Sequence, residues 1–195
     1  MGGYLSLAYG KKYPDGLKGV ILLDTKADAD TIDARQVRLD NISLIEKEIK
    51  VILSKDDNID QPTIGELMNR NEAIKAMMNG LIQKLIYRQG PKSENLGHVI
   101  SKDIEAQKAV ALTHSLSAMA GREESYTTLA NLHIPILILV GSHDVITPIA
   151  AAQKMQKSAE SKAKLCIIQN AGHLAIMEQT TDTLDSIHKW LVNLK

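Results

Sequence analysis

Residues 134–148, IPILILVGSHDVITP, decide the fold predicted for this chain. Ile134–Val140 is an unbroken apolar run, and such a run without alternation predicts a strand that is buried on both faces, as in parallel sheets. A polar loop with Ser142, His143 and Asp144 follows, and Thr147-Pro148 then predicts a helix with the threonine as its N-cap. A buried strand, a polar loop and a helix in this order indicate a parallel β/α unit.

Two other stretches extend this pattern along the chain. Leu17–Leu23 is almost continuously apolar and predicts a buried strand, preceded by a helix that ends near Gly10. Leu165–Ile168 predicts another strand, and a last helix carries one apolar face made of Leu184, Ile187, Leu191 and Leu194. The sequence therefore predicts an α/β fold with three parallel strands.

The stretch between the first two predicted strands indicates helices alone. Its apolar residues recur at three- and four-residue steps, as in Ile42, Ile45, Ile49 and Ile52. Further helices are expected over 73–85 and 103–120, with turn-rich joints at 54–62 and 89–97. We therefore divide the chain into a first core segment at 1–27, a helical insertion at 28–130 and a second core segment at 131–195. The insertion is far longer than the loops usual in α/β units.

Composition sets outer bounds on the class of protein. The chain has 195 residues, of which 44% are hydrophobic, enough for a globular domain with its own core. Lys and Arg number 23, as do Asp and Glu, so the zero formal charge favours neither nucleic acid nor an anionic membrane as a partner. The single cysteine, Cys166, excludes an intrachain disulfide and fits the reducing cytoplasm. We expect no membrane span and no signal peptide.

The chemistry of the predicted sheet lies just past the carboxyl ends of its strands. Asp24-Thr25 follows the first strand, Asp144 the second and His173 the third. An acid and a histidine after neighbouring parallel strands can meet, and a carboxylate placed in this way orients an imidazole base. We predict that Asp144 and His173 form such a pair. Asp24 is a second candidate acid, although Asp24-Thr25 also suits a role in holding the following loop through side-chain hydrogen bonds to the backbone.

No residue of the chain is expected to act as a nucleophile. Ser6 lies one turn into the first helix, Cys166 lies inside a strand, and Ser142 lies in a tight turn without the G-x-S-x-G pattern. No metal site is expected either. Asp56–Asp60 resembles the start of a calcium loop, but Gln61 and Leu67 stand where that loop needs Gly and Glu.

Several segments together resemble the α/β-hydrolase fold family. GSHDVITP (141–148) and NAGHLAIMEQ (170–179) resemble its acid and histidine segments. MGGYLSLAYGKKYP (1–14) resembles the segment after the nucleophile serine, where the elbow often reads G-x-S-M-G-G. Residues 19–38 and 115–141 resemble the two ends of the lid in bacterial hydrolases similar to 3-oxoadipate enol-lactonases. The implied fold is a truncated α/β-hydrolase fold, with the C-terminal half of the sheet, flanking helices and an inserted helical lid.

This resemblance implies a role for each site residue. His173 would deprotonate a serine, Asp144 would orient His173, and Met1 would hold the position whose backbone N–H helps to form the oxyanion hole. The serine itself is expected to precede Met1, so we expect the 195-residue chain to be inactive alone. The implied substrate is a small ester or lactone, and the family uses no metal or organic cofactor.

Two other hypotheses stay open at the level of sequence. Under the first hypothesis, the chain is a non-catalytic remnant or a binding module that uses the lid pocket. Under the second, it complements a separate polypeptide that supplies an N-terminal half. The DNA before Met1 distinguishes these hypotheses, because an in-frame G-x-S codon run would restore the enzyme and a stop codon would favour the remnant. Esterase, lactonase, epoxide hydrolase and perhydrolase chemistry are all compatible with the fold.

Overall fold

The computed structural model describes residues 1–55 and 60–194. The chain divides into two compact units, and each is described by itself. Unit 1 contains Met1–Asp28, Lys84–Leu96 and Glu124–Lys195, and unit 2 contains Ala29–Gln83 and Gly97–Glu123. Residues 84–96 therefore group with unit 1, although they lie within the helical insertion in the sequence.

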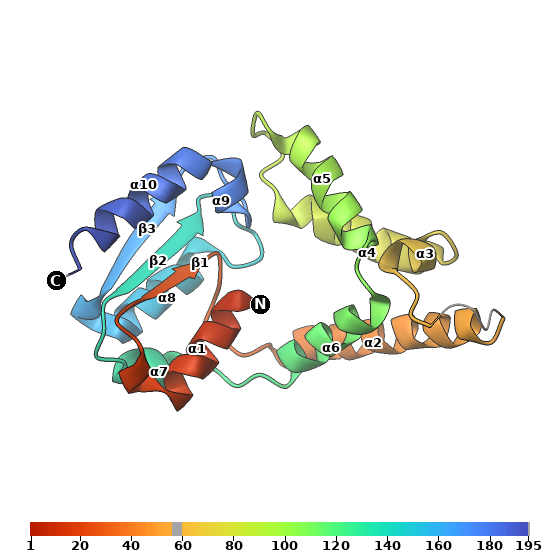
Figure 1. Ribbon diagram of the computed structural model, residues 1–195, viewed down its shortest axis with the longest axis horizontal. Coiled ribbons are helices and arrows are strands. Elements are labelled where there is room, and N and C mark those ends of the chain that lie inside the picture. The colour runs from red at the N-terminus through yellow and green to blue at the C-terminus, as the bar shows by residue number, and fades with distance from the viewer. Residues whose placement is uncertain (56–59, 195) are drawn as a thin grey trace. The chain divides into compact units, whose positions relative to one another are not determined.

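Unit 1 contains a parallel sheet in the strand order β1-β2-β3, which Figure 1 shows. The strands are β1 (Val20–Leu23), β2 (Ile136–Gly141) and β3 (Ala163–Ile168). In the register, Leu22 lies beside Ile138, and Ile138 lies beside Leu165. The predicted three-stranded parallel sheet is confirmed. β2 begins after Pro135 rather than at Ile134, because proline has no amide proton to give to a strand ladder.

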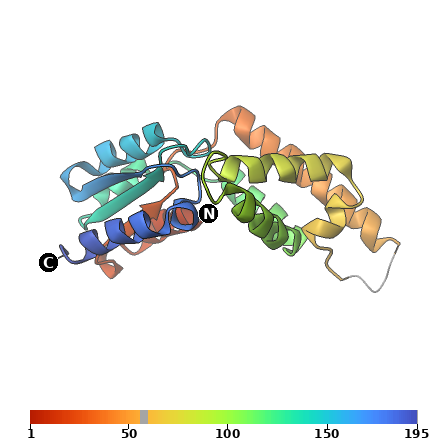
Figure 2. The same ribbon diagram turned by 90° about the horizontal axis from the view of Figure 1, so that it is seen from above.

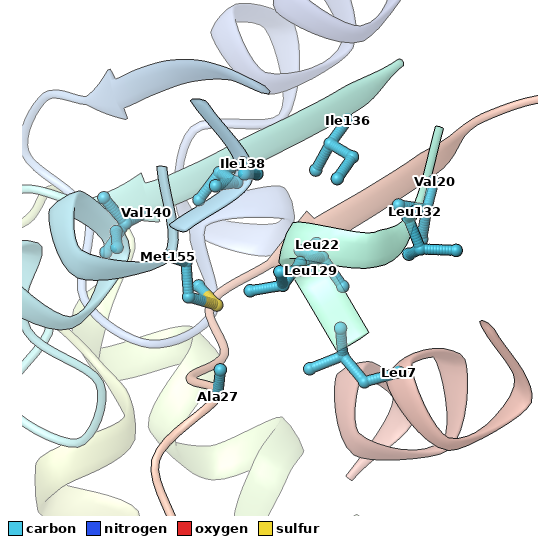
Figure 3. Close-up of a cluster of buried hydrophobic side chains, with 12 residues drawn as sticks. Leu7, Val20, Leu22, Ala27, Leu129, Leu132, Ile136, Ile138, Val140 and Met155 are labelled. Carbon is cyan, nitrogen blue, oxygen red and sulfur yellow. The ribbon is translucent and has the colours of Figure 1, made fainter. Parts of the chain in front are cut away.

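Helices of unit 1 cover both faces of this sheet. They are α1 (Gly2–Lys12), α7 (Tyr126–Asn131), α8 (Ile149–Ala159), α9 (Ala175–Glu178) and α10 (Thr180–Leu191), with short 3₁₀ turns at Pro14–Gly16 and Glu160–Lys162. Leu22 and Ile138 face a core shared with α1, α7 and α8, and Figure 3 shows this cluster. Leu137 and Leu139 face the core shared with α9 and α10. Figure 2 shows α8 and α10 on opposite sides of the sheet. Side chains alternate between the two faces along a strand, and both faces of β2 are covered by helices. Every position of β2 is therefore buried, which explains its unbroken apolar sequence.

The buried face of α10 differs from the one expected. Thr183 and Trp190 are buried and Ile187 packs beside them, whereas Leu184 and Leu191 are 52% and 48% exposed. The expectation that Leu184 and Leu191 belong to the buried face was wrong. Trp190 is the largest apolar side chain of the helix, so the face that contains it is buried. Thr183 and Ile187 lie on that same face at helical spacing, whereas Leu184 and Leu191 do not.

Unit 2 is built from helices. They are α2 (Ile32–Leu53), α3 (Ile64–Met68), α4 (Glu72–Leu85), α5 (Ser93–Glu105) and α6 (Ala109–Ala120), of which α4 ends and α5 begins in unit 1. Ile45 and Ile52 are buried in its core, and Ile42 and Ile49 pack against them, which confirms the predicted stripe of α2. Thr63 and Glu66 form a capping box that starts α3.

The single helix expected over 103–120 is in fact two helices. α5 ends at Glu105 and α6 begins at Ala109, because the intervening residues pair with the segment before α3. The Ile64 amide donates to the Gln107 carbonyl oxygen at 2.8 Å, and the Ala109 amide donates to the Pro62 carbonyl oxygen at 2.9 Å. α5 also begins inside the joint expected at 89–97. Pairing between segments so far apart in sequence leaves no mark on local periodicity.

No helix within residues 1–55 and 60–194 combines the length and the apolar character that a bilayer crossing requires.

Candidate active site

The polar loops of unit 1 meet at one edge of the sheet. Asp24 follows β1, Asp144 follows β2 and His173 follows β3, and the carboxyl ends of parallel strands lie at the same edge. The start of α1 reaches this edge as well, since Gly3 packs closely on the side chain of Thr25. We call this region the carboxyl edge.

Asp144 and His173 contact each other directly at the carboxyl edge. The Oδ2 atom of Asp144 lies 2.8 Å from Nδ1 of His173, so the expected proximity is found. The Asp144 side chain is fully buried, and that of His173 is 19% exposed. Because a carboxylate only accepts hydrogen bonds, Nδ1 carries the proton in this contact and Nε2 is the nitrogen that can accept one.

The loop after β2 holds the Asp144 carboxylate in place. Oδ1 accepts hydrogen bonds from the amides of Ile146 (2.8 Å) and Thr147 (2.9 Å), and Oδ2 accepts one from the Thr147 hydroxyl (2.6 Å). Burial acts to raise the pKa of Asp144, but the hydrogen bonds from His173 and Thr147 hold it below its ordinary value. Asp144 is therefore a carboxylate at neutral pH.

The predicted role of Thr147 as a helix N-cap was wrong. α8 begins at Ile149 with Pro148 in the N-cap position, and no side chain caps it. The Thr147 hydroxyl instead serves Asp144 and also lies 3.2 Å from Nδ1 of His173. Because α8 starts one residue later than expected, Thr147 lies before the N-cap position, where its hydroxyl donates to the buried carboxylate.

Asp24 is buried at the same edge but bonds to the backbone. Its Oδ1 accepts from the Gly141 amide at 3.0 Å, and its Oδ2 accepts from the Ala175 amide at 2.9 Å. Its φ angle of 44° lies in the left-handed region, which Asp tolerates better than most residues. Asp24 therefore ties the end of β2 to the start of α9, rather than holding the loop that follows it.

The environment of Asp24 predicts a dependence of stability on pH. Burial raises its pKa from 3.8 to about 6, against the opposing effect of the hydrogen bonds from Ala175 and Gly141. Between about pH 4 and pH 6 the folded chain retains a proton that the unfolded chain has lost, so the free energy of unfolding falls as the pH rises through this window. Asp24→Asn has no such proton and suits the same φ angle. The stability of the wild type relative to Asp24→Asn should decrease by up to about 3 kcal/mol from pH 4 to pH 7.

Urea unfolding at several pH values measures this difference. The only tryptophan, Trp190, is buried in α10, so its fluorescence reports the unfolding of unit 1. Asp185→Asn, an exposed position on the same helix, is the control and should show no such trend. A difference between wild type and Asp24→Asn that stays constant with pH would contradict the raised pKa of Asp24.

The three side chains considered as nucleophiles have other partners. The Ser6 hydroxyl donates to the Gly2 carbonyl oxygen of its own helix at 3.0 Å. The Ser142 hydroxyl accepts from the Asn170 amide at 3.0 Å and so joins the loops after β2 and β3. Cys166 is half-buried in β3 and packs on the core shared with α10. Ser142 therefore lies in the turn expected for it, where its hydroxyl links two loops.

Among the residues that the structure describes, no three His, Cys, Asp or Glu side chains are grouped so that they could hold an ion. Asp56–Ile59, considered above as a calcium loop, lies outside the described residues, so its rejection stays a prediction.

Met1 stands at the start of α1. Its carbonyl oxygen accepts from the amides of Tyr4 (3.0 Å) and Leu5 (3.2 Å), which begins the helix at the carboxyl edge. Its role in an oxyanion hole stays a proposal.

Glu178 is a feature of the site that sequence reasoning missed. It is 6% exposed, and its carboxylate accepts from the amides of Gly172 (2.8 Å) and Tyr87 (2.7 Å). The Tyr87 ring also stacks on His143, with ring centroids 3.8 Å apart. The only signal in the sequence was an acidic residue directly after the apolar run LAIM. That signal does not predict burial, because a glutamate in such a place usually lies on the surface of a helix.

Comparison with protein families gives this geometry a context. The model of the family described as serine aminopeptidase, S33, matches residues 1–180. The chain belongs to this family. This S33-family chain is also 35% identical to a proline iminopeptidase of Lactobacillus crispatus (strain ST1) over 63 residues, which are 32% of this chain and 21% of that protein.

Solved structures resemble the S33-family chain over almost its whole length. A thermophilic esterase from Thermogutta terrifontis, with malate bound, has a TM-score of 0.77 and 26% identity, and the match covers 99% of this chain and 62% of that one. The enol-lactonase from Burkholderia xenovorans LB400 has a TM-score of 0.73 and 14% identity, covering 99% and 63%. The S33-family chain thus spans less than two thirds of either protein. The predicted membership in the α/β hydrolases is confirmed.

Proposed function

We propose that this chain carries the acid and the base of a serine hydrolase that cleaves a small ester or lactone. The observation that carries the proposal is the 2.8 Å contact between Asp144 Oδ2 and His173 Nδ1, at the edge of the sheet where α/β folds bind ligands. In this role His173 accepts the serine proton at Nε2, and Asp144 holds the Nδ1–H and stabilises the imidazolium that forms.

Each step of the proposed reaction uses these two groups. The serine oxygen attacks the substrate carbonyl carbon while its proton passes to Nε2 of His173. When the tetrahedral intermediate collapses, the acyl–oxygen bond breaks and the same proton passes to the leaving alkoxide oxygen. Water then attacks the acyl-enzyme with His173 again as base, which releases the acid and restores the serine. The backbone N–H at Met1 is the proposed oxyanion donor at the start of α1.

The serine is proposed to come from a segment that precedes Met1 or from a separate polypeptide. Within the 195 residues, Ser6 and Ser142 have the structural contacts described above. The similarity to an esterase and the fold shared with an enol-lactonase support an ester or a lactone as substrate. The single cysteine supports a cytoplasmic location, which we include in the proposal.

The 195-residue chain alone should hydrolyse p-nitrophenyl butyrate no faster than the buffer. An acid and a base without a nucleophile give little rate enhancement. To supply one, we would fuse to Met1 the part of the Thermogutta terrifontis esterase that precedes the matched region, which the proposal expects to hold the serine. This polypeptide, which we call the joined enzyme, should hydrolyse the ester well above background and react with a fluorophosphonate probe.

The substrate class is tested on the same joined enzyme. Prolyl p-nitroanilide is the alternative substrate, because of the similarity to a proline iminopeptidase, and it should be cleaved far more slowly than the ester. A joined enzyme that folds cooperatively but neither reacts with the probe nor cleaves either substrate would favour the binding-module hypothesis. Hydrolysis by the 195-residue chain alone that is lost in His173→Ala would show that the chain contains its own nucleophile.

A further inference from the structure

We propose that Glu178 is a positioning residue that fixes the direction of His173; this inference rests on the proposed function of His173 as a base. Glu178 is buried in α9, five residues after the histidine, and does not bond to the imidazole. Its Oε1 accepts hydrogen bonds from the amides of Gly172 (2.8 Å) and Leu174 (3.3 Å). These are the residues on either side of His173, so one carboxylate oxygen holds the backbone before and after it.

The other carboxylate oxygen joins this loop to the segment 84–96. Oε2 of Glu178 accepts from the Tyr87 amide at 2.7 Å, and the His173 amide donates to the Leu85 carbonyl oxygen at 2.9 Å. The next amide, that of Ala175, donates to Asp24. Every backbone amide from 172 to 175 is therefore bound to an acceptor, which limits rotation of the backbone that carries the imidazole.

The arrangement requires a carboxylate at position 178. Three amide protons converge on two oxygens, and an ionised carboxylate offers acceptors on both. A glutamine offers one oxygen, and its NH₂ group would face at least one of the three N–H groups. Gly172 makes the approach possible, because a Cβ atom there would lie 2.7 Å from the Tyr87 nitrogen and 3.2 Å from Oε1 of Glu178.

The proposal predicts a change in the state of the imidazole itself. In the wild type, Asp144 holds His173 as the Nδ1–H tautomer, and the shared proton should give a strongly downfield resonance. Glu178→Ala releases the flanking amides, so the imidazole should turn from Asp144 and populate both tautomers. Long-range ¹H–¹⁵N NMR of the 195-residue chain labelled at its six histidines measures this, with His173→Gln to assign the signal.

A matched control separates positioning from general loss of stability. Thr183 is fully buried nearby, and its hydroxyl donates to the Ala175 carbonyl oxygen at 3.1 Å without touching the amides of 172–174. Thr183→Ala should lower the melting temperature and leave the His173 signals as in the wild type. Glu178→Gln, which keeps part of the hydrogen bonding, should give a tautomer ratio between those of the wild type and Glu178→Ala, and it decides the matter should the alanine variant not fold.

Kinetics of the joined enzyme give a second readout. Glu178→Ala should lower kcat by about 10- to 100-fold, because a small misplacement of a catalytic group has effects of this size. KM should change by less than about threefold, and Thr183→Ala should leave both constants within about threefold of the wild type.

The outcomes separate the two proposals. Wild-type His173 signals in folded Glu178→Ala or Glu178→Gln would overturn the positioning role and leave the proposed function standing. Altered signals in those variants, together with an inactive joined enzyme, would support the positioning role and count against the proposed function.

Discussion

His173→Ala should lower kcat/KM of the joined enzyme for p-nitrophenyl butyrate by at least about 10⁴-fold. Without the imidazole, no group is placed to take the serine proton or to return it to the leaving alkoxide. KM should change little, because the loss affects the transition state more than the bound substrate. His188→Ala, an exposed histidine on α10, is the control and should keep wild-type activity.

Asp144→Asn should lower the activity of the joined enzyme by a similar factor, because it changes which nitrogen of His173 carries the proton. The amides of Ile146 and Thr147 both donate to Oδ1, so an asparagine would keep its oxygen there and turn its NH₂ group toward His173. Nδ1 would then have to accept a hydrogen bond, which moves the ring proton to Nε2 and removes the base. We expect a loss of about 10⁴-fold in kcat.

The double variant provides a further check on this pair. Because the two residues act as a unit, His173→Ala with Asp144→Asn should be hardly slower than His173→Ala alone. Activity of Asp144→Asn within about tenfold of the wild type would argue that another acid orients His173. In that case Asp24, which is buried at the same edge, would be the next residue to substitute.

Gly141→Ala should destabilise unit 1 by about 3 kcal/mol or more. A Cβ atom on Gly141 would lie 2.5 Å from the Ala171 carbonyl oxygen and closer still to that of Gly172. Both atoms belong to the backbone of the loop that carries His173, so no side-chain rotation relieves the overlap. The loop would have to move away from β2, breaking the hydrogen bond from the His143 amide to the Ala171 carbonyl oxygen at 2.8 Å.

Urea unfolding followed by Trp190 fluorescence measures this loss within unit 1. Gly16→Ala is the matched control in the same unit, since a Cβ atom there would lie at ordinary contact distance from the Tyr9 hydroxyl (3.5 Å) and the Tyr13 Cβ atom (3.9 Å). Its free energy of unfolding should stay within about 1 kcal/mol of the wild-type value. Equal stability of the two variants would show that the loop after β3 adapts without cost.

The sequence by itself determined the sheet and the place of its polar loops. The apolar run of β2 needed both faces of a sheet to bury it, which leaves parallel strands covered by helices as the solution. Asp144 and His173 could be located because each directly follows such a strand, and that information is local. The chemical roles of the two residues stay a proposal that the sequence and the geometry support together.

Only the tertiary structure decided which atoms contact one another across the loops. The sequence left Asp24 and Asp144 as alternative acids, and the fold directs Asp144 to His173 and Asp24 to two backbone amides. The fold also directs the Thr147 hydroxyl to Asp144 and the Gly172 amide to Glu178. It groups residues 84–96 with unit 1. These outcomes depend on buried donors finding acceptors that are distant in sequence. A hydrogen bond depends on distance and angle in space, and local periodicity carries neither.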